Sequence, residues 1–187
     1  GGAGGRPGSV ARGAAVGRGS RVNWRPGQEG GRATADGRVG DCDPAGRLPM
    51  TVPRQVGQLP LYYNFKTSGR RYEYADMPYY PLYRFGYGLS YTRFEYSDLE
   101  VAEREDGCVD VKVTVRNVGR RAGDEVVQLY VTDMYASVKT RVMELKDFTR
   151  IHLAPGEARR VGFELTPYEL SLLDDRMDRV VEPGTFR

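Results

Sequence analysis

Carboxylates are the side chains of this sequence that could act as a general acid, a general base or a nucleophile, provided that two of them meet in a pocket. Glu29 lies among glycines, Glu73 and Asp76 lie in a tyrosine-rich stretch, and Asp174 and Asp175 lie together in a polar segment. Without a pocket, nothing raises the pKa of such acids or excludes water from them. We therefore interpret each as a turn, cap or solvated residue and predict no catalytic residue in the chain.

Other catalytic chemistries lack the residues that they need. His152 is the only histidine, so a histidine-based metal cluster is unavailable, and its place between Ile151 and Leu153 favours an outward-facing strand residue. Cys42 and Cys108 are far apart and have the spacing of neither a metal site nor a disulfide framework. The sequence also contains neither a phosphate-binding Walker loop nor a Gly-x-Ser-x-Gly nucleophile motif. It therefore predicts neither a metal nor a cofactor.

The composition of the chain changes near residue 50. Residues 1–50 hold eight arginines against four acids and 14 of the 24 glycines, whereas all 13 tyrosines follow Leu61. Residues 1–23 have no helical or strand period, and glycine loses more conformational entropy on folding than any other residue. We therefore predict that residues 1–23 are a disordered Gly/Arg-rich segment. A nucleic-acid-binding arm is the alternative, but no aromatic residues are interleaved there for base stacking, so no nucleic-acid partner is predicted.

The sequence shows no membrane or export signal. No apolar run reaches the roughly 18 to 20 residues that a membrane-spanning helix needs. Residue 1 is glycine and no apolar signal-peptide core follows it, so we expect a processed chain or a fragment. The cellular location is not indicated by the sequence.

Prolines and tyrosines dominate the middle of the chain. In residues 24–60, Pro49, Pro53 and Pro60 favour an extended connector that lies along a protein surface. Residues 61–93 are predicted to be ordered loops. Nine tyrosines fall in this second stretch: Tyr62, Tyr63, Tyr72, Tyr74, Tyr79, Tyr80, Tyr83, Tyr87 and Tyr91. Their rings must pack on another surface while their hydroxyls stay hydrogen-bonded.

From Phe94 onward the sequence has the period of two that is typical of half-buried strands. Apolar alternation or apolar anchors mark residues 108–115, 125–132, 143–153 and 158–165, with shorter strand material at 179–182 and 185–187. Residues 166–170 predict a capped helical turn with proline at its first position. The pattern predicts an all-β fold, an immunoglobulin or fibronectin type III-like antiparallel β-sandwich. The predicted core comprises Val111, Val113, Val115, Val127, Leu129, Val131, Phe148, Val161, Phe163 and Leu165.

Seven short motifs occur in a fixed order along the chain. They are WRPGQEGG (24–31), GDCDPAGRLP (40–49), PRQVGQLPLYYN (53–64), PLYRFGYGLSYTRF (81–94), RAGDEVVQLYV (121–131), ELKDF (144–148) and LAPGE (153–157). Together they resemble the C-terminal portion of a glycoside hydrolase of family 3, the β-glucosidase and β-xylosidase group. The sequence departs from that pattern at Cys42 and Asp43, where the family has Tyr-Asn, at Phe65, where it has histidine, and at residues 35–39, where it has an apolar helix.

The resemblance implies an enzyme of three parts: a TIM-like barrel, an α/β sandwich domain and a fibronectin type III-like domain. In these terms residues 24–60 are a remnant of the α/β sandwich domain, residues 61–93 are a tyrosine-rich linking segment, and residues 94–187 are the fibronectin type III-like domain with its last strand truncated. The barrel and most of the α/β domain are expected to be absent from this chain and to be its partners.

The resemblance also implies where catalysis takes place. Retaining glycosidases use two carboxyl groups about 5 to 5.5 Å apart. The family pattern places the nucleophilic aspartate in the barrel and the acid/base glutamate upstream of Trp24, so the chain alone is expected to be inactive. The predicted function is a structural module of an enzyme that hydrolyses β-glucosides or β-xylosides in carbohydrate catabolism. The alternative is a carbohydrate-binding module that stacks a β-linked oligosaccharide on the tyrosines of residues 62–91.

Overall fold

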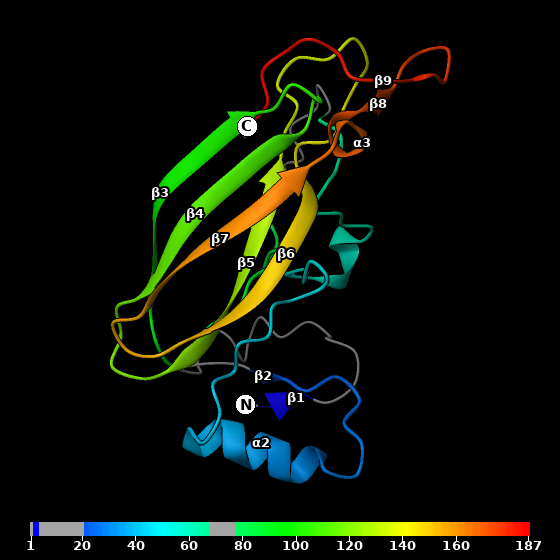
Figure 1. The fold of residues 1–187 in the computed structure, drawn as a ribbon. Coiled ribbons are helices and arrows are strands. Elements are labelled where there is room, and N and C mark those ends of the chain that lie inside the picture. Colours follow the sequence, from blue (N-terminus) through cyan, green and yellow to red (C-terminus); the bar gives the residue numbers. More distant parts are fainter. Residues whose placement is uncertain (1, 4–20, 68–77) are drawn as a thin grey trace. The chain divides into compact units, whose positions relative to one another are not determined.

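A computed structural model of the chain describes residues 2–3, 21–67 and 78–187 and divides into two compact units (Figure 1). The first unit comprises Gly1–Tyr63 and Arg70–Leu89, and the second comprises Asn64–Gly69 and Ser90–Arg187. Within the described residues, no helix is both long and apolar enough to cross a membrane.

The first unit contains a helix that the sequence pattern does not predict. Helix α2 (Gly30–Val39) lies inside the stretch for which the prolines and glycines favour an extended connector. Its surface is polar and mostly exposed, and part of its support comes from Arg21. The guanidinium of Arg21 donates to the backbone carbonyl oxygens of Thr34 at 3.0 Å and Gly37 at 2.5 Å. A long-range contact of this kind cannot be inferred from the local hydrophobic pattern.

Two very short strands of the first unit fall within the segment predicted to be disordered. Strand β1 (Gly2–Ala3) pairs in parallel with β2 (Arg21–Val22). Most of residues 1–23 lie outside the described residues, so the disorder of that segment stays a prediction. Between α2 and the tyrosine-rich stretch, a single 3₁₀ turn, η1, covers Val56–Gln58.

The second unit is a β-sandwich of two antiparallel sheets. One sheet has the strand order β3–β4–β7, with β3 at Phe94–Glu103, β4 at Val109–Asn117 and β7 at Ala158–Leu165. The other pairs β5 (Gly123–Val131) with β6 (Glu144–Leu153). A short hairpin of β8 (Leu172–Leu173) and β9 (Arg179–Val180) follows, and Phe186 forms a single bridge with Asp133. The predicted all-β, fibronectin type III-like fold is therefore confirmed.

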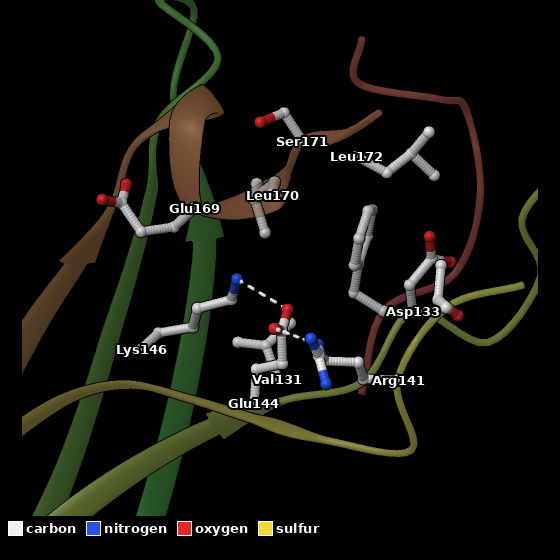
Figure 2. A pocket seen from close by; sticks show the side chains of 11 residues that line it. Val131, Asp133, Arg141, Glu144, Lys146, Glu169, Leu170, Ser171 and Leu172 are labelled. Atoms are coloured by element: carbon white, nitrogen blue, oxygen red, sulfur yellow. Dashed lines mark hydrogen bonds and ion pairs between the residues drawn. The ribbon is translucent and has the colours of Figure 1, made fainter. Parts of the chain in front are cut away.

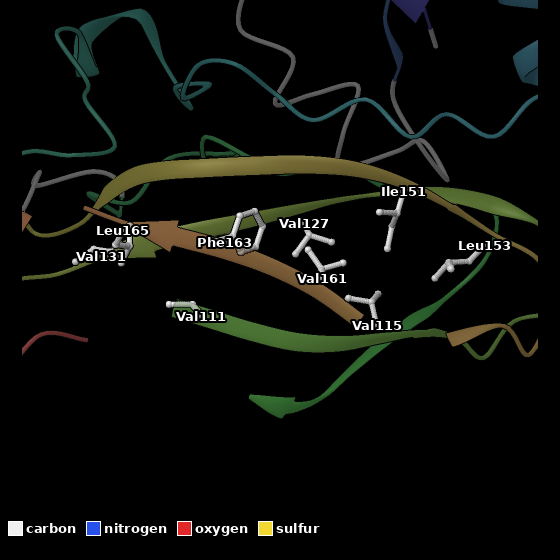
Figure 3. Close-up of a cluster of buried hydrophobic side chains, with 9 residues drawn as sticks. All are labelled: Val111, Val115, Val127, Val131, Ile151, Leu153, Val161, Phe163 and Leu165. Carbon is white, nitrogen blue, oxygen red and sulfur yellow. The ribbon is translucent and has the colours of Figure 1, made fainter. Parts of the chain in front are cut away.

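The core lies between the two sheets (Figure 3). Most of the predicted core residues are buried, and Val113 and Leu129 are half-buried against the others. The buried set is Val111, Val115, Val127, Val131, Ile151, Leu153, Val161, Phe163 and Leu165. Valines that alternate along β4 and β5 thus supply one residue in two to the core, as the period of two requires.

One predicted core residue is wrong. Phe148 is 62% exposed, because on β6 the inward side chains are those of Ile151 and Leu153. Counting back by two from these residues places Phe148 on the outward face. The sequence-based assignment joined apolar residues at a spacing of three along 143–153, and a register shift opposite Leu129 and Tyr130 further interrupts the alternation of this strand pair.

The helical turn after β7 forms as predicted. Helix α3 (Pro167–Leu170) has proline in its first turn, and Thr166 precedes it in the extended conformation of an N-cap. The backbone N–H of Thr166 donates to Oε2 of Glu169 at 2.8 Å, which satisfies a donor at the start of the turn. The hydrogen bond from the Thr166 hydroxyl to the same carboxylate holds the pKa of Glu169 below its usual range.

Candidate functional site

The acids that the sequence singles out occupy turn and cap positions. Glu29 directly precedes α2 and is exposed, and it makes no side-chain capping hydrogen bond. Oδ1 of Asp174 accepts the backbone N–H groups of Arg176 and Asp178, both at 2.9 Å, so this carboxylate closes a turn. Asp175 beside it is exposed. Glu73 and Asp76 lie outside the described residues.

The densest group of acids in the second unit surrounds one arginine. The guanidinium of Arg104 lies 2.7 Å from a carboxylate oxygen of Asp106, 3.3 Å from Asp110 and 2.8 Å from Glu164. Its hydrogen bond to Asp106 holds the pKa of that carboxyl well below its usual range. A general acid needs the opposite shift, because it must stay protonated near neutral pH. We therefore interpret this cluster as ion pairs at the solvated end of the β3–β4 hairpin. No sequence motif indicates it.

A second charged cluster joins β5 to β6. Asp124 on β5 accepts hydrogen bonds from Nε of Arg150 at 2.9 Å and from Nδ1 of His152 at 2.5 Å. Partial burial pushes the pKa of Asp124 upward, but the hydrogen bonds from His152 and Arg150 outweigh it and hold this pKa below its usual value. His152 is exposed on the outward face of its strand, as the sequence predicts. No nucleophilic side chain is hydrogen-bonded to His152 among the described contacts, so the geometry is that of a cross-strand ion cluster.

A small pocket lies at the end of the sandwich between α3, the start of β6 and the end of the chain (Figure 2). Glu144 is shared there by two cations, with its oxygens 3.4 Å from Nε of Arg141 and 3.1 Å from Nζ of Lys146. The volume is about 50 Å³, whereas pockets for small organic ligands span roughly 300 to 1,000 Å³. It therefore has room for a few water molecules and not for a sugar.

The tyrosine-rich stretch of the first unit is held by backbone pairing. Residues 48–52 run beside residues 82–87: the N–H of Val52 donates to the carbonyl of Tyr83 at 2.9 Å, and that of Gly86 donates to Leu48 at 2.8 Å. Gln58, which is 3% exposed, fixes the start of the second segment. Its amide nitrogen donates to the carbonyl oxygens of Pro78 and Tyr79 at 3.3 and 3.4 Å. The two segments therefore form a hydrogen-bonded pair.

The described aromatic rings of this unit pack mostly on one another. Tyr83 stacks on Tyr87 with ring centroids 5.3 Å apart, and Tyr63 stacks on Phe85 at 4.1 Å. The rings of Tyr79 and Tyr80 meet edge to face at an interplanar angle of 80°, and the guanidinium of Arg54 lies 4.6 Å from the centroid of Tyr80. Four tyrosines of this unit nevertheless keep 42% to 64% of their surface exposed: Tyr62, Tyr79, Tyr80 and Tyr87. Rings that pack on one another and also keep exposed surface suit a segment that contacts a further surface.

The charged clusters and the pocket of the described residues therefore do not form a catalytic centre. In this part of the chain, no group of three His, Cys, Asp or Glu side chains is placed to hold a metal ion. The features with the clearest structure are the paired segments of the first unit and the sandwich of the second.

Comparisons with known proteins match each of these two parts of the chain to a known domain. A family model for the glycosyl hydrolase family 3 C-terminal domain matches residues 21–91, and one for the fibronectin type III-like domain matches residues 125–187. The chain is 41% identical over 166 residues to a putative beta-xylosidase of Formosa agariphila, covering 87% of this chain and 22% of that protein. It is 42% identical over 176 residues to the periplasmic beta-glucosidase of Salmonella typhimurium, covering 87% of this chain and 23% of that protein.

Solved structures show the same relationship. The beta-glucosidase of Listeria innocua in complex with isofagomine superposes with a TM-score of 0.92 and 38% identity, covering 99% of this chain and 28% of that one. The chain therefore spans about a quarter of the length of the relatives that it matches. Because both family models match in order and the fold agrees along nearly the whole chain, this protein belongs to glycoside hydrolase family 3 and corresponds to the C-terminal portion of its members.

Proposed function

We propose that this chain serves as the C-terminal structural part of a family 3 enzyme that hydrolyses β-glucosides or β-xylosides. The observation that supports this proposal is that 87% of the chain is similar to proteins named as beta-glucosidases and beta-xylosidases. The chain spans less than a quarter of the length of those proteins. Among its described acids, Glu29 precedes a helix, Asp174 closes a turn, and Asp106, Asp110, Glu164 and Asp124 belong to ion clusters. The reaction itself needs two positioned carboxyl groups, which the proposal assigns to the parts of such an enzyme that this chain does not match.

The proposal divides the chain in the order of its elements. Residues 24–60 belong to the α/β sandwich domain, residues 61–93 link it to the sandwich, and residues 94–187 form the fibronectin type III-like domain. The start of β3 at Phe94 and the separate family matches before and after it support this division. The partners are the barrel and the remainder of the α/β domain.

A chimera tests the proposed function. This chain replaces the matching segment of the Listeria innocua beta-glucosidase, whose fold it shares with a TM-score of 0.92. We expect a folded chimera that hydrolyses nitrophenyl β-glucoside, nitrophenyl β-xyloside or both, because the catalytic carboxylates come from the retained part. A chimera that folds, melts cooperatively and turns over neither substrate would contradict the proposal.

A further inference from the structure

Charge is distributed unevenly over the sandwich. Residues 90–187 hold 15 arginines and lysines against 19 acids, so this part of the chain is acidic overall. Seven of its arginines nevertheless lie in three short stretches that hold only four acids, and these stretches are residues 92–95, 115–125 and 150–160. The rest of residues 90–187 therefore holds eight cations against 15 acids.

The three stretches meet at one end of the sandwich, where the β4–β5 and β6–β7 turns lie (Figure 1). In one sheet, Phe94 at the start of β3 is paired with Asn117 at the end of β4. In the other, Gly123 at the start of β5 is paired with Leu153 at the end of β6. The strand register thus brings these stretches together into one region, which is termed the basic end.

The arginines of the basic end lie in solvent, and most of its acids lie beneath the surface. All seven arginines are exposed, whereas Asp124 and Glu157 are half-buried and Glu125 is 8% exposed. The fourth acid, Glu95, is exposed and lies 3.5 Å from Arg93. The basic end therefore presents mainly positive charge to a partner that approaches through water.

Three of these arginines, Arg116, Arg120 and Arg121, have no carboxylate partner among the described contacts. Nη1 of Arg116 donates to the carbonyl oxygen of Gly156 at 3.2 Å, and the guanidinium of Arg121 lies 6.0 Å from the ring centroid of Tyr91. Both contacts are with neutral groups, so the three positive charges are not neutralised. Like charges on neighbouring residues repel one another, and an anionic partner relieves that repulsion.

The β4–β5 turn that carries two of these arginines is fixed by a buried side chain. Asn117 donates to the carbonyl oxygen of Arg121 at 2.8 Å and accepts from the N–H of Gly119 at 3.0 Å. A methyl group at Gly119 would collide with the hydroxyl of Thr92, so the turn packs closely on the start of β3. A turn that is already ordered loses little conformational freedom when a ligand binds.

The chemistry of the exposed groups selects the ligand. A guanidinium recognises planar anionic groups through two parallel N–H donors, and both carboxylate and phosphate fit that pattern. Single-stranded nucleic acids are held in addition by open aromatic rings on which the bases stack. Phe94 is the only aromatic residue in the three stretches, and it is half-buried. The basic end therefore favours a flexible polymer of carboxylates over a nucleic acid.

We propose that the basic end binds a polysaccharide that carries carboxylate groups, such as a chain of uronic acids, with Arg116, Arg120 and Arg121 as the ligands of the carboxylates. The choice of a polysaccharide rests on the proposed function, because an enzyme that acts on β-linked sugars works among such polymers. Binding of this kind holds the chain on a charged polymer at low ionic strength and is weakened by salt.

Two matched triple variants of the full chain test the site. The first carries Arg116→Gln, Arg120→Gln and Arg121→Gln. The control loses the same three charges at exposed positions outside the basic end, through Lys139→Gln, Arg176→Gln and Arg187→Gln. Both are titrated with polygalacturonate at low salt, after urea unfolding has shown that they fold. The first should bind at least about tenfold more weakly than the native chain, and the control less than about twofold more weakly.

A single variant keeps the test independent of folding. The side chain of Arg120 is exposed and makes no described hydrogen bond or ion pair, so Arg120→Gln removes charge without removing a structural contact. It should weaken polygalacturonate binding about two- to threefold. Unchanged binding in both Arg120→Gln and the first triple variant would overturn the proposed site.

Further outcomes identify the ligand and separate this inference from the proposed function. Equal losses in the two triple variants would show general attraction to a cationic chain, which overturns the site. Tighter binding of an oligothymidylate with the same number of charges would overturn the choice of a polysaccharide. An active chimera beside a chain that does not bind polygalacturonate would refute this inference alone. A folded but inactive chimera beside arginine-dependent binding would refute the proposed function and still support the site.

Discussion

The side chain of Asn117 forms hydrogen bonds with several turn regions of the sandwich. It is fully buried, and its amide nitrogen donates to the carbonyl oxygens of Arg121 at 2.8 Å and Leu153 at 3.0 Å. Its amide oxygen accepts from the Thr92 hydroxyl at 2.6 Å and from the N–H of Gly119 at 3.0 Å. The side chain thus joins its own turn at residues 119–121 to two segments that are distant in sequence, at Thr92 and at Leu153, and no local pattern singles it out.

Replacing this residue tests its role. Asn117→Ala leaves several buried groups without partners, and each such group costs about 1 to 3 kcal/mol, so we expect unfolding free energy to fall by roughly 3 kcal/mol. Thr92→Ala removes one of the four hydrogen bonds and should cost about 1 kcal/mol. Urea titrations of both variants measure this. Equal, small losses for the two changes would show that Asn117 is not the connecting group.

The Asp124 cluster gives the sandwich a predictable response to acid. Because the folded-state pKa of Asp124 lies below the unfolded value of about 3.9, its ionised form stabilises the fold above about pH 4. That contribution is lost as the pH falls through the folded-state pKa. Asp124→Asn should therefore be less stable than the native chain at pH 7 and should lose less stability between about pH 4 and 2. Urea unfolding measures the unfolding free energy of the native chain, of Asp124→Asn and of the exposed control Asp175→Asn across this pH range. Equal slopes of unfolding free energy against pH for all three proteins would refute this prediction.

At the scale of single elements, strand β6 allows a matched comparison of its two faces. Leu153 is fully buried and Phe148 is 62% exposed on the same strand. Leu153→Ala creates a cavity and should cost about 2 to 5 kcal/mol. Phe148→Ala should cost less than about 1 kcal/mol in the isolated chain, because surface changes are usually small. Denaturant titration distinguishes the faces, and a larger loss for Phe148→Ala would restore the sequence-based assignment of this ring to the core.

The elements that could be predicted are those whose stability is encoded locally. Alternating valines indicate β4 and β5, and a proline after threonine indicates α3. Helix α2 is missed because its support includes the Arg21 side chain rather than an apolar stripe. Clusters such as that of Arg104 are missed for a similar reason, since their members come together only through the hairpin and the pairing of neighbouring strands.

The paired segments of the first unit depend on a close backbone approach at Gly88. A methyl group there would lie 2.5 Å from the carbonyl oxygen of Gly46, whereas one at Gly46 itself meets nothing within 4 Å. Gly88→Ala should therefore loosen the pairing, and Gly46→Ala should not. Amide hydrogen exchange at Leu48 and Gly86 reports on it, with an expected acceleration of about tenfold or more in the first variant only. Equal exchange in both variants would show that the backbones can separate without cost.

For the whole molecule, the described carboxyl groups share one chemical state. The sandwich has a core of nine buried residues between its sheets, and the tyrosine-rich stretch is held by backbone pairing and by Gln58. The acids with a resolved pKa shift, such as Asp106 and Glu169, are all lowered. Carboxyl groups in that state serve as ion-pair and hydrogen-bond acceptors. Glycosidic catalysis instead needs one carboxyl group that remains protonated beside another that is ionised.

The isolated chain should accordingly show no glycosidase activity. Micromolar protein incubated with nitrophenyl β-glucoside and nitrophenyl β-xyloside should release nitrophenol no faster than buffer does, while a full-length relative run in parallel turns over. Any residual rate must be followed through purification and then compared with that of two variants, Glu29→Gln inside the first family motif and Asp174→Asn in the turn between β8 and β9. A rate that copurifies with the chain and disappears in either variant would place a catalytic carboxylate here, and would show that the chain acts as more than a structural part of its enzyme.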